Sequence, residues 1–406
     1  MMSAEDIIKN WNLTKISFGE GSLSKAGEIS MEMGMKRPLI CIGGGSVEKF
    51  GYLNVLTDVL EKMGLQYNLI RGVEPNPSIG TIYRIALKAL QSQSDGFIAL
   101  GGGSVIDATK AANVLVTLNT DDIHPYFGVN NIQNELNRDL MPLLPIPTTA
   151  GTSAEVTKYS NVSDLVLGVK KLISDPSIIP KRAIVDPKLT ISCPPKLTRI
   201  VGLDTLTHLM EGYLNNVHDD IDPKANERAI EGMRLVFNYL PKAVNDGKNI
   251  EARKMMSLAC VLGGTVIVYK STGGPHMNSF SWFSVMDHGE ATALMLPYYV
   301  AYYGKNISKK LEIIANIMNL DLSNNQTKTI VEGLFAFYRT IGQPTKISDY
   351  QEFPKDFISK AIKDASQNQM KLDNMPRPIP AEKSDKILKI ILEGAWNGHI
   401  DKILKL

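Results

Sequence analysis

The chain has 406 residues, of which 44% are hydrophobic and 21% charged, and its formal net charge is +2. This size and composition predict a soluble globular protein of two or three domains with room for a sizeable core. The balanced charge excludes the basic bias of proteins that bind nucleic acid or anionic membranes. The sequence lacks both a long apolar run and the basic and apolar regions of a signal peptide, so we expect a cytoplasmic protein.

Three scattered cysteines fit a reducing compartment. Cys41, Cys193 and Cys260 are odd in number and lack the spacing of a metal site. We expect each to be a small buried side chain with no nucleophilic role.

Short apolar runs alternate with amphipathic stretches in the first half of the chain. The pattern predicts strands at 38–42, 67–71, 96–100 and 143–147. Helices are expected from about residue 81 to 91 and from the glycine-rich turn at 101–104 to about 115. Strand, loop and helix repeated in this way favour an α/β domain with a parallel sheet.

The pattern becomes helical beyond Asp186-Pro187. Apolar residues recur at helical spacing over 197–213, 225–240, 252–268, 308–318 and 327–340. We therefore expect an α/β domain over residues 1–190, followed by an all-α domain over residues 191–406.

Glycine-rich turns follow three of the predicted strands. Gly101-Gly-Gly-Ser104 opens a helix, so its backbone and the helix N-terminus can approach a phosphate. The alternative is a tight turn with no ligand. Gly43-Gly-Gly-Ser46 and Thr148-Thr-Ala-Gly-Thr-Ser153 end two other strands. Because ligands gather at the carboxyl ends of parallel strands, the three turns together favour a dinucleotide site.

Asp204 and His208 lie four residues apart on a predicted helix, so both side chains occupy one face. Together with His276 and His288 they offer a ligand set suited to Fe(II), Zn(II) or a similar divalent ion. The alternative is a solvated surface pair, worth only about 0.2–0.5 kcal/mol. We interpret His124, His218 and His399 as structural or exposed.

An aromatic group follows His276 in the sequence. Phe280, Trp282 and Phe283 are candidates for lining an apolar substrate pocket, although such clusters are more often part of a core.

Several of these motifs occur together in the order found in one enzyme family. From about residue 15 to 300 the chain resembles the iron-containing alcohol dehydrogenases, which share the dehydroquinate synthase-like fold. The matching segments are Phe18-Gly-Glu-Gly21, Val73-Glu-Pro-Asn-Pro77, Gly101–Lys110, Pro147–Glu155, Ala183–Pro187, Gly202–His208 and His288-Gly289.

The resemblance implies an N-terminal dinucleotide-binding α/β domain and a C-terminal helical domain that holds a metal. It places the metal on Asp204, His208, His276 and His288. It places the cofactor phosphates on Gly102, Gly103 and Ser104. Further positions that match cofactor contacts are Asp107, Thr148, Thr149, Thr152, Thr157 and Lys170.

The chain departs from the family pattern at three points. Phe280 stands where the family has a histidine that relays a proton or orients substrate. His288 follows His276 by twelve residues, where the family has fourteen. Gly43 ends the first strand where many NAD-preferring relatives carry an acidic residue, so no carboxylate repels a 2′-phosphate there. This last departure slightly favours NADP over NAD.

The implied activity is reversible hydride transfer between a primary or secondary alcohol and NAD(P), with the alkoxide on the divalent metal. We expect a small alcohol or aldehyde as substrate and a homo-oligomer, in the form of a dimer. Because Phe280 cannot carry a proton, the candidate routes are water, the ribose hydroxyls of the cofactor and Asp107, and Asp107 is the candidate catalytic residue. Three alternatives stay open: a glycerol or polyol dehydrogenase, a dehydroquinate-synthase-like lyase, and a catalytically silent member.

Overall fold

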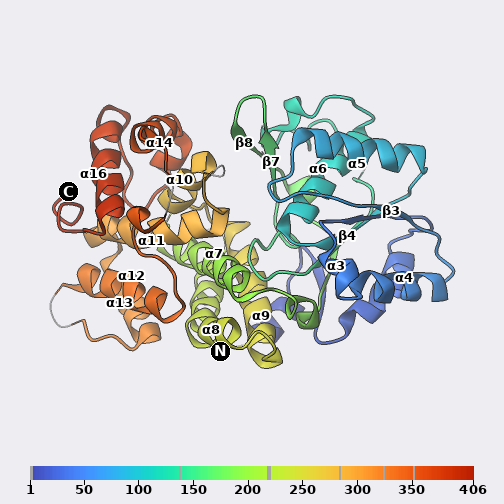
Figure 1. The fold of residues 1–406 in the computed structure, drawn as a ribbon, viewed down its shortest axis with the longest axis horizontal. Helices are drawn as coiled ribbons and strands as arrows, with labels where there is room; N and C mark the ends of the chain where they lie inside the picture. Colours follow the sequence, from blue (N-terminus) through green and yellow to red (C-terminus); the bar gives the residue numbers. More distant parts are fainter. Residues whose placement is uncertain (1–2, 137–138, 217–220, 283–284, 323–324, 351–352) are drawn as a thin grey trace. The chain divides into compact units, whose positions relative to one another are not determined.

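The computed structural model describes residues 3–136, 139–216, 221–282, 285–322, 325–350 and 353–406. The chain forms two compact units (Figure 1). The first runs to Cys193 and includes Gly247–Ser257, and the second contains Pro194–Asp246 and Leu258–Leu406.

A four-stranded parallel sheet forms the centre of the first unit, in the order β3-β2-β4-β6. Its strands are β2 (Leu39–Ile42), β3 (Asn68–Ile70), β4 (Phe97–Gly101) and β6 (Leu143–Pro147). Each lies where the alternation of apolar runs and glycine turns predicts a strand. The expected α/β class with a parallel sheet is thus confirmed.

Helices cover both faces of this sheet, which explains why its central strands are apolar at every position. Leu39 and Cys41 of β2 face one cluster with the apolar side chains of α5 and α6, while Ile40 and Ile42 face another with α4. Figure 1 shows α5 and α6 on the opposite side of the strands from α3 and α4. The helices of this unit are α1 (Ala4–Lys9), α2 (Ala26–Glu32), α3 (Ser46–Lys49), α4 (Tyr52–Lys62), α5 (Ile79–Gln91) and α6 (Gly103–Leu118).

Two smaller sheets complete the first unit, and the sequence patterns did not indicate them. β1 (Lys15–Phe18) pairs in parallel with β9 (Arg182–Val185). β7 (Tyr159–Asp164) and β8 (Val169–Ser174) form an antiparallel hairpin, and β5 (Gly128–Val129) pairs with β8. The hairpin matters for the site because its strand β7 packs on α6.

Helices are the only regular secondary structure in the described part of the second unit, which confirms the expected all-α class. They are α7 (Pro195–Leu214), α8 (Ala225–Asn245), most of α9 (Ile250–Ile267), α10 (Gly274–Trp282), α11 (His288–Tyr303), α12 (Ser308–Met318), α13 (Gln326–Thr340), α14 (Phe357–Ser366), α15 (Gln369–Asp373) and α16 (Ser384–Asn397).

The core of the second unit contains two helices that are enclosed on every side. Every residue of α7 from Gly202 to Leu214 is buried, as is every residue of α11 from Gly289 to Tyr303. α7 packs against both α8 and α11. Polar side chains on such helices are kept from water, so each needs a partner inside the protein.

Among the described helices, none is both long enough and apolar enough to cross a lipid bilayer.

Candidate active site

One face of α7 carries three ionisable side chains. Asp204, His208 and Glu211 follow one another at spacings of four and three residues, which places them on adjacent turns. Their residues are only 2%, 5% and 3% exposed. The interpretation of Asp204 and His208 as a solvated surface pair is therefore wrong.

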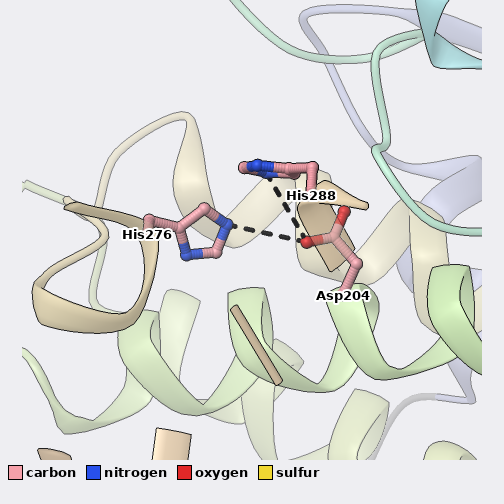
Figure 2. A group of neighbouring side chains, drawn as sticks. All are labelled: Asp204, His276 and His288. Carbon is pink, nitrogen blue, oxygen red and sulfur yellow. Dashed lines mark ion pairs between the residues drawn. The ribbon is translucent and has the colours of Figure 1, made fainter. Parts of the chain in front are cut away.

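Asp204 is the point on which the three predicted histidines converge. Its Oδ1 atom lies 3.7 Å from Nε2 of His276, 3.8 Å from Nε2 of His288 and 4.0 Å from Nε2 of His208. His276 comes from the first turn of α10, and His288 is the first residue of α11. Figure 2 shows both imidazoles turned toward the Asp204 carboxylate. The twelve-residue spacing thus still brings His288 to the cluster.

These separations are too long for hydrogen bonds but suit one ion bonded to several ligands at about 2.0–2.2 Å. Asp204, His276 and His288 each present a ligand atom, and these atoms all lie within 4.8 Å of one another. Among the described residues, Nε2 of His276 is buried and has no hydrogen-bond partner. A lone pair kept dry and unpaired beside a carboxylate fits a divalent cation.

His208 lies slightly apart from this group of three. Its ring stacks on that of His276, with centroids 4.7 Å apart and planes 21° from parallel. The His276 ring meets that of His288 nearly edge-on, at 5.3 Å and 64°. The structure thus brings all four predicted ligands together, with His208 at the edge of the cluster.

The cluster lowers the pKa of both Asp204 and His276. Burial raises the pKa of Asp204, but the three histidines and a hydrogen bond from Thr292 outweigh it and hold that pKa below its usual value. Burial, followed by the neighbouring His208, lowers the pKa of His276 well below 6.5. An anionic oxygen and a neutral imidazole are the protonation states that a metal requires.

Glu211 belongs to the site although the sequence patterns did not single it out. Its Oε2 atom is hydrogen-bonded to Nδ1 of His276. Its Oε1 atom accepts a hydrogen bond from the N–H of Gly273 at 2.7 Å. Burial raises the pKa of Glu211, while the ammonium of Lys371 and the Gly273 N–H limit the rise. The available signal was its spacing, seven residues after Asp204 on the same helix face.

The first unit gathers the predicted phosphate-binding residues at the carboxyl ends of β4 and β6. A Cβ atom on Gly103 would lie 2.3 Å from Oγ1 of Thr152, and one on Gly102 would lie 3.4 Å from Oγ1 of Thr149. The turn after β6 therefore packs directly on the turn that starts α6. This contact explains why glycine is needed at Gly103.

Ser104 and Thr148 complete this group. The hydroxyl of Ser104 accepts the N–H of Asn76 at 3.2 Å, and the N–H of Thr148 donates to the Gly101 carbonyl at 2.9 Å. Loops that follow β3, β4 and β6 are thus bonded to one another at a single sheet edge.

Asp107, Thr157 and Lys170 form a second group, where α6 meets the β7–β8 hairpin. Oδ2 of Asp107 accepts the N–H of Asn161 at 3.0 Å. Lys110 donates to the carbonyl of Thr157 at 2.7 Å. Burial raises the pKa of Asp107 to about 6, opposed by Lys110, by the hydrogen bonds from Asn161 and by the charge of Lys170. The hydrogen bond of Asp107 with Asn161 therefore connects α6 to the hairpin.

The remaining sequence candidates differ in their burial. Trp282 is fully buried and its ring meets that of Phe357 edge-on at 4.9 Å, so it is a core residue. Phe280 is partly buried, and His124 and His399 are exposed. Phe283 and His218 lie outside the described residues.

Comparison with known proteins gives one consistent match along the chain. Residues 14–187 match the family described as iron-containing alcohol dehydrogenase, and residues 198–392 match the C-terminal part of the same family. An NADPH-dependent butanol dehydrogenase of Clostridium saccharobutylicum is 31% identical over 395 residues, covering 93% of this chain and 96% of that protein.

Two further relatives agree. A 1,3-propanediol dehydrogenase of Klebsiella pneumoniae is 29% identical and covers 86% of this chain and 91% of its own. A solved alcohol dehydrogenase from Oenococcus oeni superposes with a TM-score of 0.85 at 27% identity, covering 94% of this chain and 98% of its own. The two-part match and the fold lead to one assignment: this chain belongs to the iron-containing alcohol dehydrogenase family and is an oxidoreductase that acts on CH–OH groups.

Proposed function

We propose that this protein interconverts a small primary alcohol and its aldehyde with NADP as hydride carrier and one divalent ion held by Asp204, His208, His276 and His288. The observation that carries the proposal is the enclosed Asp204 carboxylate with three imidazole nitrogens within 4.0 Å and the unpaired Nε2 of His276. In the forward direction, alcohol and NADP⁺ give aldehyde, NADPH and a proton.

The four ligands have distinct tasks. Asp204 supplies the negative charge that offsets part of the cation's charge, and the three histidines supply neutral donors. A divalent ion bound there would act as a Lewis acid toward the substrate oxygen. Fe(II) and Zn(II) both suit this donor set, and the family favours iron. The burial of Asp204, His208 and His276 keeps bulk water from the ligands.

The cofactor phosphates are proposed to lie against Gly102, Gly103 and Ser104. These residues start α6, which is 16 residues long, so free backbone N–H groups and the positive end of the helix dipole serve an anion there. Thr149 and Thr152 contact the same glycines. The further proposed cofactor positions are Thr148, Thr157, Lys170 and Asp107.

The preference for NADP rests on Gly43. Gly43 directly follows β2 and has no side chain, so it presents no carboxylate to a 2′-phosphate on the adenosine ribose. The C. saccharobutylicum relative, whose name gives NADPH as its cofactor, supports the same choice.

We propose that the proton passes through Asp107. Its raised pKa, about 6, suits a group that exchanges protons near neutrality. Phe280 offers no titratable group in place of the family's histidine.

A second candidate function is oxidation of a diol or glycerol. The name of the K. pneumoniae relative gives 1,3-propanediol as its substrate, which supports this alternative. We also infer a cytoplasmic homodimer. The three buried cysteines, none of them in a disulfide, support the reducing compartment, and the family resemblance supports the dimer.

The test is a metal-reconstitution assay. Protein stripped with a chelator is reloaded with Fe(II), Zn(II) or Mn(II) and assayed at 340 nm with NAD⁺ or NADP⁺ and with 1-butanol, 1,3-propanediol or glycerol. We expect activity only after loading, highest with 1-butanol and NADP⁺. His276→Ala should lose metal and turnover, while the control His399→Ala, which alters an exposed histidine, should keep both. Full turnover by stripped protein would contradict the proposal.

A further inference from the structure

His276 makes a buried contact on the side of its ring that faces away from Asp204. Nδ1 of this imidazole is bonded to Glu211, while Nε2 faces Oδ1 of Asp204 at 3.7 Å. A neutral imidazole carries one N–H proton. If the hydrogen-bond partner of one nitrogen holds the proton there, the other nitrogen has a free lone pair. The partner of Nδ1 therefore determines whether Nε2, which faces Asp204, carries a proton or a free lone pair.

We propose that Glu211 is the positioning residue that holds the proton of His276 on Nδ1 and so keeps Nε2 free to bind the metal. This inference rests on the metal site proposed above and assigns a task to a residue outside the ligand set. Histidines that bind metals commonly donate their second N–H to a carboxylate in this way.

The two oxygens of Glu211 are both committed. Oε1 accepts the backbone N–H of Gly273 at 2.7 Å, and Oε2 meets Nδ1 of His276. Both partners can only donate to Glu211 in its ionised form, since a backbone N–H has no lone pair to offer and a carboxylate has no proton. Glu211 therefore fixes the direction of the hydrogen bond to His276 as well as its presence.

The backbone around this contact is held rigidly. Gly274 starts α10 against the ring of Tyr299, and a Cβ there would lie 2.1 Å from Cε1 of that ring. The N–H of Gly274 donates to the hydroxyl of Tyr303 at 3.2 Å. Lys371 donates to the carbonyl of Thr272 at 2.8 Å, which keeps an ammonium group near Glu211. His276 thus has little freedom to exchange its partner.

Replacing Glu211 by glutamine exchanges one acceptor oxygen for an NH₂ donor with almost no change in shape. If the amide oxygen stays with the Gly273 N–H, the amide NH₂ faces Nδ1 and must donate to it. The proton of His276 then moves to Nε2, which can no longer bind a metal. If the amide turns over, its NH₂ opposes the Gly273 N–H, which leaves two donors facing each other. The same change in a serine-protease triad leaves the geometry intact but selects the wrong tautomer.

The first experiment compares metal affinity. Stripped wild-type protein, Glu211→Gln and the control Asp222→Asn are titrated with Zn(II) against a chromophoric chelator. Asp222 pairs with Arg228 in the same unit, so this control removes a carboxylate charge that is partly buried but not bonded to a ligand. We expect Glu211→Gln to bind zinc about 10- to 100-fold more weakly and Asp222→Asn to match wild type.

The second experiment reads the tautomer directly. In ¹⁵N-histidine-labelled stripped protein, the His276 signals are assigned by their loss in His276→Ala. We expect the proton on Nδ1 in wild type and on Nε2 in Glu211→Gln. Cobalt-loaded samples should also differ in their visible absorption, because the ligand field changes. A loss of packing alone would not move the proton between the two nitrogens.

The outcomes separate the two proposals. If wild-type protein binds no zinc, the metal site itself is wrong. If wild type binds zinc and Glu211→Gln binds it equally well, the role of Glu211 is wrong. The tautomer of wild-type His276 decides the case without any variant at Glu211, so the test holds even if Glu211→Gln does not fold. A proton found on Nε2 in stripped wild type would overturn the inference.

Discussion

Gly289 touches Asp204 so closely that no other residue fits between α11 and α7. A Cβ atom placed on Gly289 would lie 2.9 Å from Cβ of Asp204 and 2.6 Å from the carbonyl oxygen of Ile200. The glycine directly follows His288, so the same contact sets the distance between two of the proposed ligands. The close packing of these helices is therefore a condition for assembling the cluster.

Replacing Gly289 by alanine should push α11 away from α7. Because the nearest obstacle is backbone, we expect a loss of roughly 1–3 kcal/mol in stability, as for other overpacked cores. Zinc affinity should fall in parallel. Urea unfolding and chelator competition measure the two effects. Gly80→Ala serves as control, since a Cβ there meets only Oγ of Ser78 at 3.7 Å. It should raise stability by about 0.5–1 kcal/mol. Equal behaviour of the two variants would refute the packing argument.

Gly103→Ala should damage the phosphate loop. The new methyl group would meet Oγ1 of Thr152 at 2.3 Å, which forces the two turns apart. We expect a lower melting temperature and weaker binding of NADPH. Fluorescence titration measures the binding. Gly102→Ala tests the same loop with a nearest contact of 3.4 Å, so its melting temperature should change less. A smaller loss of melting temperature in Gly103→Ala than in Gly102→Ala would contradict this prediction.

Gly43→Asp should reverse the choice of cofactor. A Cβ at this position lies 3.3 Å from the Val73 carbonyl and 3.6 Å from Val105, so a side chain fits after a small adjustment. The added carboxylate would repel a 2′-phosphate. The ratio of kcat/KM for NADP⁺ to that for NAD⁺ should fall at least about tenfold, equivalent to 1.4 kcal/mol. Gly43→Asn has nearly the same size without the charge and should change the ratio much less. An unchanged ratio in Gly43→Asp would remove the basis for the NADP preference.

Asp107 should make stability depend on pH in an unusual direction. Burial raises its pKa in the folded protein from 3.8 to about 6. Between these values the folded state holds more protons than the unfolded state, so stability falls as pH rises through this window. Lys110, whose pKa burial lowers to about 8, stays charged throughout.

Asp107→Asn removes this dependence. Relative to wild type, the variant should gain on the order of 2 kcal/mol between pH 4 and pH 7. Urea unfolding at several pH values measures the difference, with Asp121→Asn as an exposed control. Parallel stability curves for wild type and Asp107→Asn would count against the raised pKa.

The parallel sheet and most long helices could be predicted because their signals are local. Strands such as β4 are short apolar runs that end in glycine, and helices such as α8 show apolar residues at helical spacing. The group of Asp204, His208, His276 and His288 was also predictable, since two members share a helix face and the motif order resembles a known family. The structure brings them together, and their binding of a metal stays a prediction.

The features that were not predicted depend on long-range packing. The β7–β8 hairpin contains polar residues such as Ser160, Asn161 and Lys170. It is bonded to α6 through Asp107 and Lys110, which no local pattern indicates. The segment Gly247–Ser257 joins the first unit although helical segments of the second surround it in sequence. The partner of Glu211 lies 65 residues away, so no local pattern could reveal the contact.

The buried helix α7 supplies Asp204, His208 and Glu211 from a single rigid rod. Two proposed ligands and the carboxylate behind a third therefore keep their mutual spacing whatever happens in the connecting loops. A change in the length of the segment before His288, or in the residue at position 280, leaves the spacing of these three side chains on α7 unchanged. The part of the proposed metal site that lies on α7 is therefore specified by one continuous helix of the sequence.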